Sequence, residues 1–126
     1  MIVGIGTDII KIERMTALFE RHGTAFVNRI FTKEEKNEAT TRKNPIEYYA
    51  GRWAAKEAVS KALQCGIGKN CSWQDINIQN TPEGNPQLFL DGSAAAKAVE
   101  INAVNFHVSI SHEREYACAM VIFESA

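Results

Sequence analysis

Two acidic residues and one lysine have the types and spacing that could support chemistry on a phosphate. Asp8 is the only charged residue among the first ten, in a stretch that otherwise reads as a buried strand. A carboxylate is costly to bury unless it is ion-paired, hydrogen-bonded or bound to a cation. Glu57 and Lys61 lie four residues apart and so share one face of any helix that contains them. Each also has an ordinary explanation, because Asp8 could cap the helix that follows and Glu57 with Lys61 could form an exposed helical pair.

A glycine-containing loop and nearby basic residues extend this pattern. The loop at 64–69 contains Gly66 and ends in a lysine, and the segment before it carries Arg52. Backbone amides of such a loop, beside Lys and Arg, can hold phosphates, although helices also commonly stop at glycine. Two carboxylates from separate elements suit Mg²⁺, which takes one or two protein carboxylates and fills its other positions with water and phosphate. The residues alone therefore favour a magnesium-dependent transfer of a phosphoryl-type group.

A second group of reactive side chains lies near the C-terminus. His107, Ser109 and Ser111 alternate, which places them on one face of a strand, and His112 follows at the turn. No aspartate stands at a position that would complete a Ser-His-Asp triad, so this pattern gives little support to a hydrolase.

The first half of the chain is predicted to carry a strand and three helices. Residues 3–9 alternate in a way that predicts a strand, and a short basic helix is expected at 14–22. Thr32 followed by Glu35 has the form of a capping box and predicts the next helix, which should end before the Asn-Pro pair that follows.

The longest predicted helix begins at that Asn-Pro pair. Asn44, Pro45 and Glu47 supply a cap, a first-turn proline and a third-position carboxylate. The helix should run to about residue 64, with Gly66 as its C-terminal stop.

The second half is predicted to be mostly strands. Asp91 can cap a small Ala-rich helix that reaches about residue 100. Central helices followed by antiparallel strands indicate an α+β fold, with an antiparallel sheet packed against a long central helix and shorter helices. We expect a single domain over residues 1–126. The predicted strands are 75–79, 87–90, and a hairpin made of 106–111 and 116–123.

The charge of the chain is unevenly distributed. The 14 Lys and Arg residues and 15 Asp and Glu residues give a formal net charge of −1, which argues against nucleic acid as a partner. Residues 1–69 hold 12 basic and 8 acidic residues, whereas residues 70–126 hold 2 and 7. The basic half could therefore still receive an anionic small molecule or an acidic protein.

The sequence predicts neither a targeting signal nor a paired-cysteine motif. The apolar start of the chain is too short for a membrane span and has no basic lead-in, so neither a signal peptide nor a membrane protein is expected. Cys65, Cys71 and Cys118 are odd in number and show no Cys-x-x-Cys pairing. We therefore expect reduced thiols in a cytoplasmic protein rather than a disulfide framework or a zinc site.

Four segments, taken together and in this order, resemble the holo-[acyl-carrier-protein] synthase family of 4′-phosphopantetheinyl transferases. They are GIGTDIIKIER at 4–14, GRWAAKEAVSKAL at 51–63, WQDINI at 73–78 and HVSISHEREYACAMVI at 107–122. The resemblance implies that coenzyme A donates its 4′-phosphopantetheine arm to a serine of apo acyl carrier protein. The products would be holo acyl carrier protein and adenosine 3′,5′-bisphosphate, in fatty acid biosynthesis.

The resemblance also assigns roles to the residues that match the family. Asp8 and Glu57 would hold Mg²⁺, and Lys61 would lie at the phosphates and neutralise charge as the pyrophosphate bond breaks. Either Glu57 or a metal-bound water would take the serine proton. Coenzyme A would be contacted by Arg52, Lys61, Gly66, Ser109 and His112, and acyl carrier protein would dock on Arg14, Arg21 and Arg29.

One segment departs from the family, and one family property has no counterpart in the sequence pattern. Gln64, Cys65 and Gly66 stand where the family usually has Gly-Thr-Gly, so the loop loses a hydroxyl and gains a thiol near the predicted substrate site.

The family forms homotrimers with sites between subunits, which the resemblance implies for this chain as well.

Two other functions are compatible with the sequence. A non-catalytic module could bind an acidic protein through the basic half, and it would need Arg14 and Arg21 but not Asp8 with Glu57. A magnesium-dependent phosphohydrolase would release product from coenzyme A without an acceptor.

Overall fold

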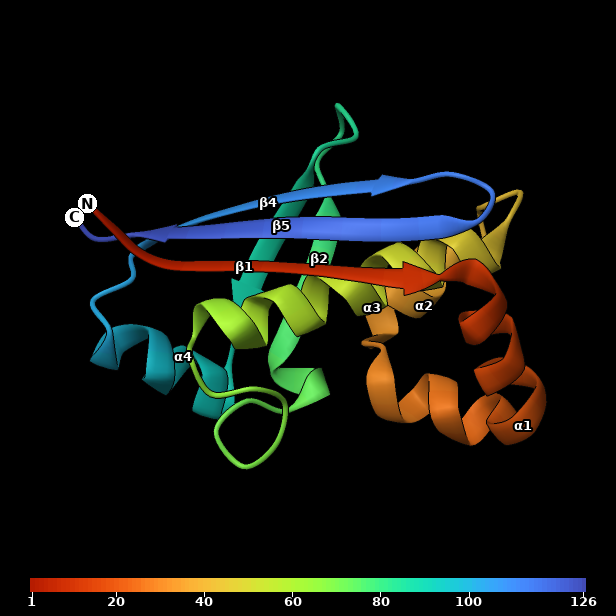
Figure 1. Cartoon of the computed structure of the whole chain (residues 1–126), viewed down its shortest axis with the longest axis horizontal. Coiled ribbons are helices and arrows are strands. Elements are labelled where there is room, and N and C mark those ends of the chain that lie inside the picture. The colour runs from red at the N-terminus through yellow and green to blue at the C-terminus, as the bar shows by residue number, and fades with distance from the viewer.

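A three-stranded antiparallel sheet covers one side of a long central helix in the computed structural model, which describes residues 1–126 (Figure 1). The strand order is β1-β5-β4, with β1 at Ile2–Lys11, β4 at Asn105–His112 and β5 at Tyr116–Glu124. Because β1 pairs with β5 in antiparallel register, the two chain ends lie together at one end of the sheet. The predicted first strand and C-terminal hairpin are confirmed, and both are slightly longer than predicted.

The central helix α3 (Pro45–Ala62) begins as predicted. The side chain of Asn44 accepts a hydrogen bond from the backbone N–H of Glu47, and Pro45 occupies the first turn. Alanines make much of the helix surface that contacts the sheet, and they are fully buried. A slim helix face of this kind lets a strand backbone come unusually close.

Glycines in β1 complete this close approach. A Cβ atom added at Gly4 would collide with the carbonyl of Ala62, and one added at Gly6 would collide with the carbonyl of Ala58. These glycines therefore serve strand-to-helix packing rather than a ligand. The contact sets the position of the next α3-facing residue of β1, which is Asp8.

The helix that follows β1 differs from the prediction. Helix α1 covers Ile12–Ile30, not only 14–22, and it bends at Gly23, whose φ of 58° is left-handed. The bend lets a second helical segment pack Phe26 and Ile30 into the core. The basic stretch in the sequence thus marked only the first part of a longer, kinked helix.

The end of α3 also differs from the prediction. Gln64, not Gly66, is the first left-handed residue after the helix, with φ of 65°. Its backbone N–H donates to the Lys61 carbonyl at 2.9 Å, and the N–H of Cys65 donates to the Ser60 carbonyl at 3.2 Å. This is the Schellman arrangement, which usually has glycine at the position that Gln64 occupies.

A buried ion pair joins α3 to α2 (Lys33–Ala39). The Nζ of Lys56 lies 2.8 Å from the Oε1 of Glu35, and both side chains are fully buried. Glu35 also completes the predicted capping box with Thr32. Burial lowers the pKa of Lys56, and the facing carboxylate opposes that shift. Lys56 also donates to the carbonyls of Ile30, Trp73 and Ile76. These bonds connect the end of α1 and the segment at 73–76 to α3.

The remaining elements form a small hairpin and one helix. A 3₁₀ turn at Trp73–Asp75 leads into β2 (Ile76–Asn80), which pairs with β3 (Pro86–Leu90) in a separate two-stranded sheet. Helix α4 (Gly92–Glu100) is capped by Asp91, as predicted. None of the helices is both long and apolar enough to cross a membrane.

Candidate active site

The structure brings together the three residues that the sequence singled out first. The Nζ of Lys61 donates to the Thr7 carbonyl at 2.9 Å and lies 3.3 Å from the Oδ1 of Asp8. Lys61 is about half exposed, whereas the Asp8 side chain is only 18% exposed. The carboxylate that looked anomalous in the sequence is therefore held at the rim of the strand–helix contact, beside a cation.

Glu57 completes this cluster. The pKa of its carboxyl is raised, first by burial and then by the negative charge of Asp8, while Lys61 and Arg14 lower it. Lys61 on α3 forms its ion pair with Asp8 on β1, and not with Glu57 one turn earlier on the same helix. The ordinary explanation, an exposed Glu57–Lys61 helical pair, is thus wrong.

The donor set fits a hard cation. No group of three or more His, Cys, Asp or Glu side chains comes together in the structure, which speaks against a cage built entirely from protein ligands. Two carboxylates from β1 and α3, close enough that the charge of Asp8 raises the pKa of Glu57, are what Mg²⁺ uses when substrate phosphate supplies further oxygens.

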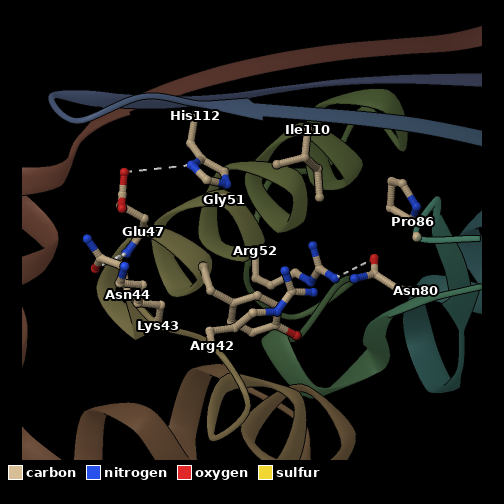
Figure 2. A pocket seen from close by; sticks show the side chains of 12 residues that line it. Arg42, Lys43, Asn44, Glu47, Gly51, Arg52, Asn80, Pro86, Ile110 and His112 are labelled. Atoms are coloured by element: carbon tan, nitrogen blue, oxygen red, sulfur yellow. Dashed lines mark hydrogen bonds and ion pairs between the residues drawn. The ribbon is translucent and has the colours of Figure 1, made fainter.

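A separate, strongly basic pocket of about 330 Å³ opens near the first turns of α3 (Figure 2). Figure 2 shows Arg52 and His112 on opposite sides of it, the first from α3 and the second from the end of β4. The Arg52 guanidinium donates to the Oδ1 of Asn80 at 2.9 Å, and the Nδ1 of His112 lies 3.8 Å from the Oε1 of Glu47. The pocket therefore brings together two of the residues predicted to contact coenzyme A.

The basic character of this pocket comes partly from residues that sequence reasoning missed. Arg42 and Lys43 line it from the turn before α3. Two guanidinium groups lie over the ring of Tyr48, with the carbon Cζ of Arg42 at 5.0 Å and that of Arg52 at 4.5 Å from its centroid. The sequence did contain a signal for these two residues, because they are adjacent basic residues in the turn just before a predicted helix start. Side chains in such a turn extend past the end of the helix.

The structure does not bring every predicted coenzyme A residue to this pocket. Ile110 and His112 face α3, so Ser109 points to the opposite, exposed face of β4. Gly66 lies in the loop after the other end of α3. A single chain thus carries a carboxylate–lysine cluster and a basic pocket in two different places along α3.

The three arginines predicted to dock a protein are all exposed on α1. Arg14 lies close enough to Glu57 to influence its pKa, which places the start of α1 beside the carboxylate cluster. Arg29 lines a mainly apolar cavity of about 370 Å³ on the far part of α1. That cavity also contains Leu18, His22, Phe26, Trp53 and Trp73.

The fold and this arrangement of residues define a class of protein. Residues 4–121 match the family described as the 4′-phosphopantetheinyl transferase superfamily, and the chain belongs to that family.

Individual relatives carry a more specific name than the superfamily does. A protein of Vibrio vulnificus named holo-[acyl-carrier-protein] synthase is 46% identical over 124 residues, which is 98% of each chain. The crystal structure of holo-[acyl-carrier-protein] synthase from Neisseria meningitidis superposes with a TM-score of 0.92 at 36% identity and covers 99% of this chain and 100% of that one. The Helicobacter pylori synthase in complex with coenzyme A has a TM-score of 0.84 at 34% identity, covering 95% of this chain and 99% of that one.

Proposed function

We propose that this protein transfers the 4′-phosphopantetheine group from coenzyme A to a serine of apo acyl carrier protein, in fatty acid biosynthesis. The observation that carries the proposal is the Asp8–Glu57–Lys61 cluster, two carboxylates and a cation from β1 and α3, in a chain of this family. The name of the Vibrio relative and the coenzyme A bound to the Helicobacter relative support the same reaction.

Asp8 and Glu57 are the residues proposed to hold Mg²⁺. When bound, the ion supplies positive charge at the pyrophosphate of coenzyme A. Asp8 is ion-paired with Lys61, and Glu57 is half-buried, with a pKa that burial and the charge of Asp8 raise. Lys61 is proposed to neutralise the negative charge that develops on the leaving bisphosphate.

The basic pocket is proposed to bind the bisphosphate end of coenzyme A. Arg52 and His112 were predicted to contact coenzyme A, and Arg42 and Lys43 add two more positive groups. Several cations around one cavity suit a ligand with several phosphate charges.

The separation of the two sites supports an assembly in which neighbouring chains complete each other. We propose a homotrimer with sites between subunits, to which Gly66 and Ser109 would contribute from different chains. The exposed face of the sheet carries Ile5, Ile9 and Met120, which are 61%, 64% and 47% exposed. An apolar patch of this kind commonly marks a protein interface.

Acyl carrier protein is proposed to dock on α1 through Arg14, Arg21 and Arg29. All three are exposed, and Arg14 lies beside the carboxylate cluster, so a protein bound there could present a serine to it. We propose that the whole chain acts as one domain in the cytoplasm, with no membrane or nucleic acid partner.

Mass spectrometry of an apo carrier protein provides the test. With coenzyme A and Mg²⁺, the wild-type protein should add one phosphopantetheine mass to the carrier. A non-catalytic docking module would add nothing, and a phosphohydrolase would consume coenzyme A with no carrier present.

The Glu57→Gln variant tests the metal assignment within this assay. It removes one carboxylate charge without changing side-chain size, so the transfer rate should fall by about 100-fold or more while the fold is retained. Wild-type rates from this variant would refute the role given to Glu57. Glu100→Gln, on the exposed surface of α4, is the matched control and should transfer normally.

A further inference from the structure

A buried tyrosine contacts two of the cations that line the basic pocket. Tyr48 is 6% exposed and lies on α3 one helical turn before Arg52. The centroid of its ring is 4.5 Å from the Cζ of Arg52 and 5.0 Å from the Cζ of Arg42, which comes from the turn before the helix. Both distances fall within the range in which the face of an aromatic ring attracts a cation.

Each guanidinium has one further side-chain partner, and the two partners are unrelated. Arg52 is buried and donates to the Oδ1 of Asn80 at 2.9 Å (Figure 2). The Nη2 of Arg42 lies 3.2 Å from the Oε1 of Glu38, in an ion pair that is more than one-third exposed on both sides. Such an exposed pair holds a side chain only weakly. The Tyr48 ring is therefore the contact that the two arginines share.

The ring of Tyr48 makes this contact, and its hydroxyl group adds no hydrogen bond. The Oη of Tyr48 is buried and has no hydrogen-bond partner. A buried hydroxyl without a partner reduces stability, so a phenylalanine could occupy this position without losing a hydrogen bond. The face of the ring, which phenylalanine also has, is what attracts the guanidinium groups.

We propose that Tyr48 is a positioning residue for the basic pocket, whose ring holds the guanidinium groups of Arg42 and Arg52 in place for the bisphosphate end of coenzyme A. This role rests on the proposed function, which assigns that ligand to the pocket. Two like charges repel each other and long side chains are mobile, so a ring that attracts both cations orders them before the ligand arrives. Ordering a site in advance reduces the entropy that binding must cost.

The proposed role predicts an effect on binding and not on the chemical step. Tyr48 lines the basic pocket, which is separate from the Asp8–Glu57–Lys61 cluster. Loss of the ring should therefore raise the KM for coenzyme A and leave kcat unchanged. A residue that served only the packing of the core would change the stability of the fold without changing this KM.

Isothermal titration calorimetry of the full-length protein with adenosine 3′,5′-bisphosphate measures the affinity of the pocket directly. Tyr48→Leu keeps an apolar side chain but removes the ring, so the Kd should rise by about 10-fold. Tyr48→Phe keeps the ring and should stay within about 2-fold of the wild-type Kd. A Kd that is unchanged in Tyr48→Leu, or that rises equally in both variants, would overturn the proposal.

The neighbouring tyrosine provides the matched control. Tyr49 is also buried, at 8% exposure, but its ring packs on Phe31 at 4.5 Å and Phe19 at 5.1 Å, and no cation lies over it. Tyr49→Leu should lower the free energy of unfolding without changing the Kd for the bisphosphate. If Tyr49→Leu weakens binding as much as Tyr48→Leu does, general loss of packing explains both and the proposal is wrong.

A fluorinated ring keeps the test decisive if Tyr48→Leu does not fold. Pentafluorophenylalanine at position 48 has nearly the size of phenylalanine, but its fluorine atoms withdraw electron density from the face of the ring. The Kd should therefore be about 5-fold higher than in Tyr48→Phe, while urea denaturation shows a retained fold. Equal affinity of these two proteins would show that the ring face does not hold the arginines.

A double-mutant cycle tests whether Tyr48 acts through its arginine partners. In an Arg42→Gln background, one of the two cations is already absent, so Tyr48→Leu should raise the Kd by a smaller factor than in the wild-type background. The same factor in both backgrounds would contradict action through Arg42.

Transfer kinetics separate this proposal from the proposed function. In the mass-spectrometric assay, Tyr48→Leu should raise the KM for coenzyme A by about 10-fold at unchanged kcat, whereas a lower kcat at unchanged KM would refute the positioning role. If the variants change the Kd as expected but the wild-type protein transfers nothing, the proposed function is wrong and the role of Tyr48 stands. A wild-type protein without affinity for the bisphosphate would overturn the assignment of the pocket and the role of Tyr48 together.

Discussion

At the residue scale, Lys61 combines a structural contact with a proposed catalytic role, and the sequence alone could not separate the two. It holds Asp8 through an ion pair and the β1 backbone through the Thr7 carbonyl, and it is proposed to stabilise the leaving phosphate. Since about half of its side chain is exposed, the ion pair contributes little to the stability of the fold. Its loss should therefore affect chemistry much more than folding.

The Lys61→Ala variant should keep its affinity for the carrier protein while kcat falls by about 100-fold. Initial rates at several carrier concentrations separate kcat from KM. Lys97→Ala, which removes another surface ion pair on α4, is the control and should leave both parameters unchanged. Loss of carrier affinity with normal kcat would show that Lys61 belongs to the docking surface.

At the element scale, the end of α3 carries local strain that the sequence pattern did not reveal. Gln64 adopts a left-handed conformation in a Schellman turn, where glycine is usually preferred. Its side-chain nitrogen makes only a long hydrogen bond of 3.4 Å to the Val3 carbonyl. Little in the structure compensates for the strained backbone.

Replacing Gln64 with glycine should raise the free energy of unfolding by about 1 kcal/mol, because glycine adopts this conformation without a Cβ penalty. Urea denaturation followed by circular dichroism measures the change. The matched substitution Gln79→Gly, within β2, should destabilise the protein instead, since a strand residue with negative φ gains nothing from glycine.

Helix α1 carries the docking prediction at this same scale. Its bend at Gly23 separates Arg14 and Arg21 from Arg29, so the three exposed charges do not lie along one straight helix. We expect Arg21→Ala to raise KM for the carrier protein by about 5-fold with kcat unchanged, because a charge at the edge of an interface mainly affects association. Arg114→Ala, exposed in the turn between β4 and β5, is the control.

The dependence of KM on salt concentration gives a second test of this docking surface. If α1 binds an acidic protein, KM for the carrier should rise with ionic strength in the wild-type protein and less steeply in Arg21→Ala. Identical salt dependence in the two proteins would place the docking surface elsewhere.

At the scale of the whole molecule, one face of the sheet is covered by α3 and the other carries exposed apolar side chains (Figure 1). The carboxylate cluster and the basic pocket lie in different places along α3. Both observations have one explanation if chains assemble through the exposed face and combine their sites.

Ile5→Lys places a charge on this exposed face and should convert the proposed trimer to monomers with an intact fold. Analytical ultracentrifugation gives the mass, and circular dichroism checks the fold. Val99→Lys is the matched control, since Val99 is 75% exposed on α4, away from the sheet, and its variant should assemble normally. A wild-type protein that sediments as a monomer would refute the assembly.

Local sequence determined much of the fold. Helix starts were predicted correctly at Thr32, Asn44 and Asp91, because a cap depends on side-chain oxygens and backbone groups only a few residues apart. Residue types and spacing likewise singled out Asp8, Glu57 and Lys61 before any contact was known, and the family motifs suggested their roles. Such signals lie within a few positions and need no tertiary information.

Only the tertiary structure decided how these parts meet. The pairing of Lys61 with Asp8 rather than Glu57 depends on the close approach of β1 to α3, which the glycines of β1 allow. The two guanidinium groups over the Tyr48 ring come from a turn and from a helix, and the pairing of Gly68 with Cys71 folds the loop after α3 back on itself. Each depends on the three-dimensional path of the backbone, because the atoms involved become neighbours only after the chain has folded.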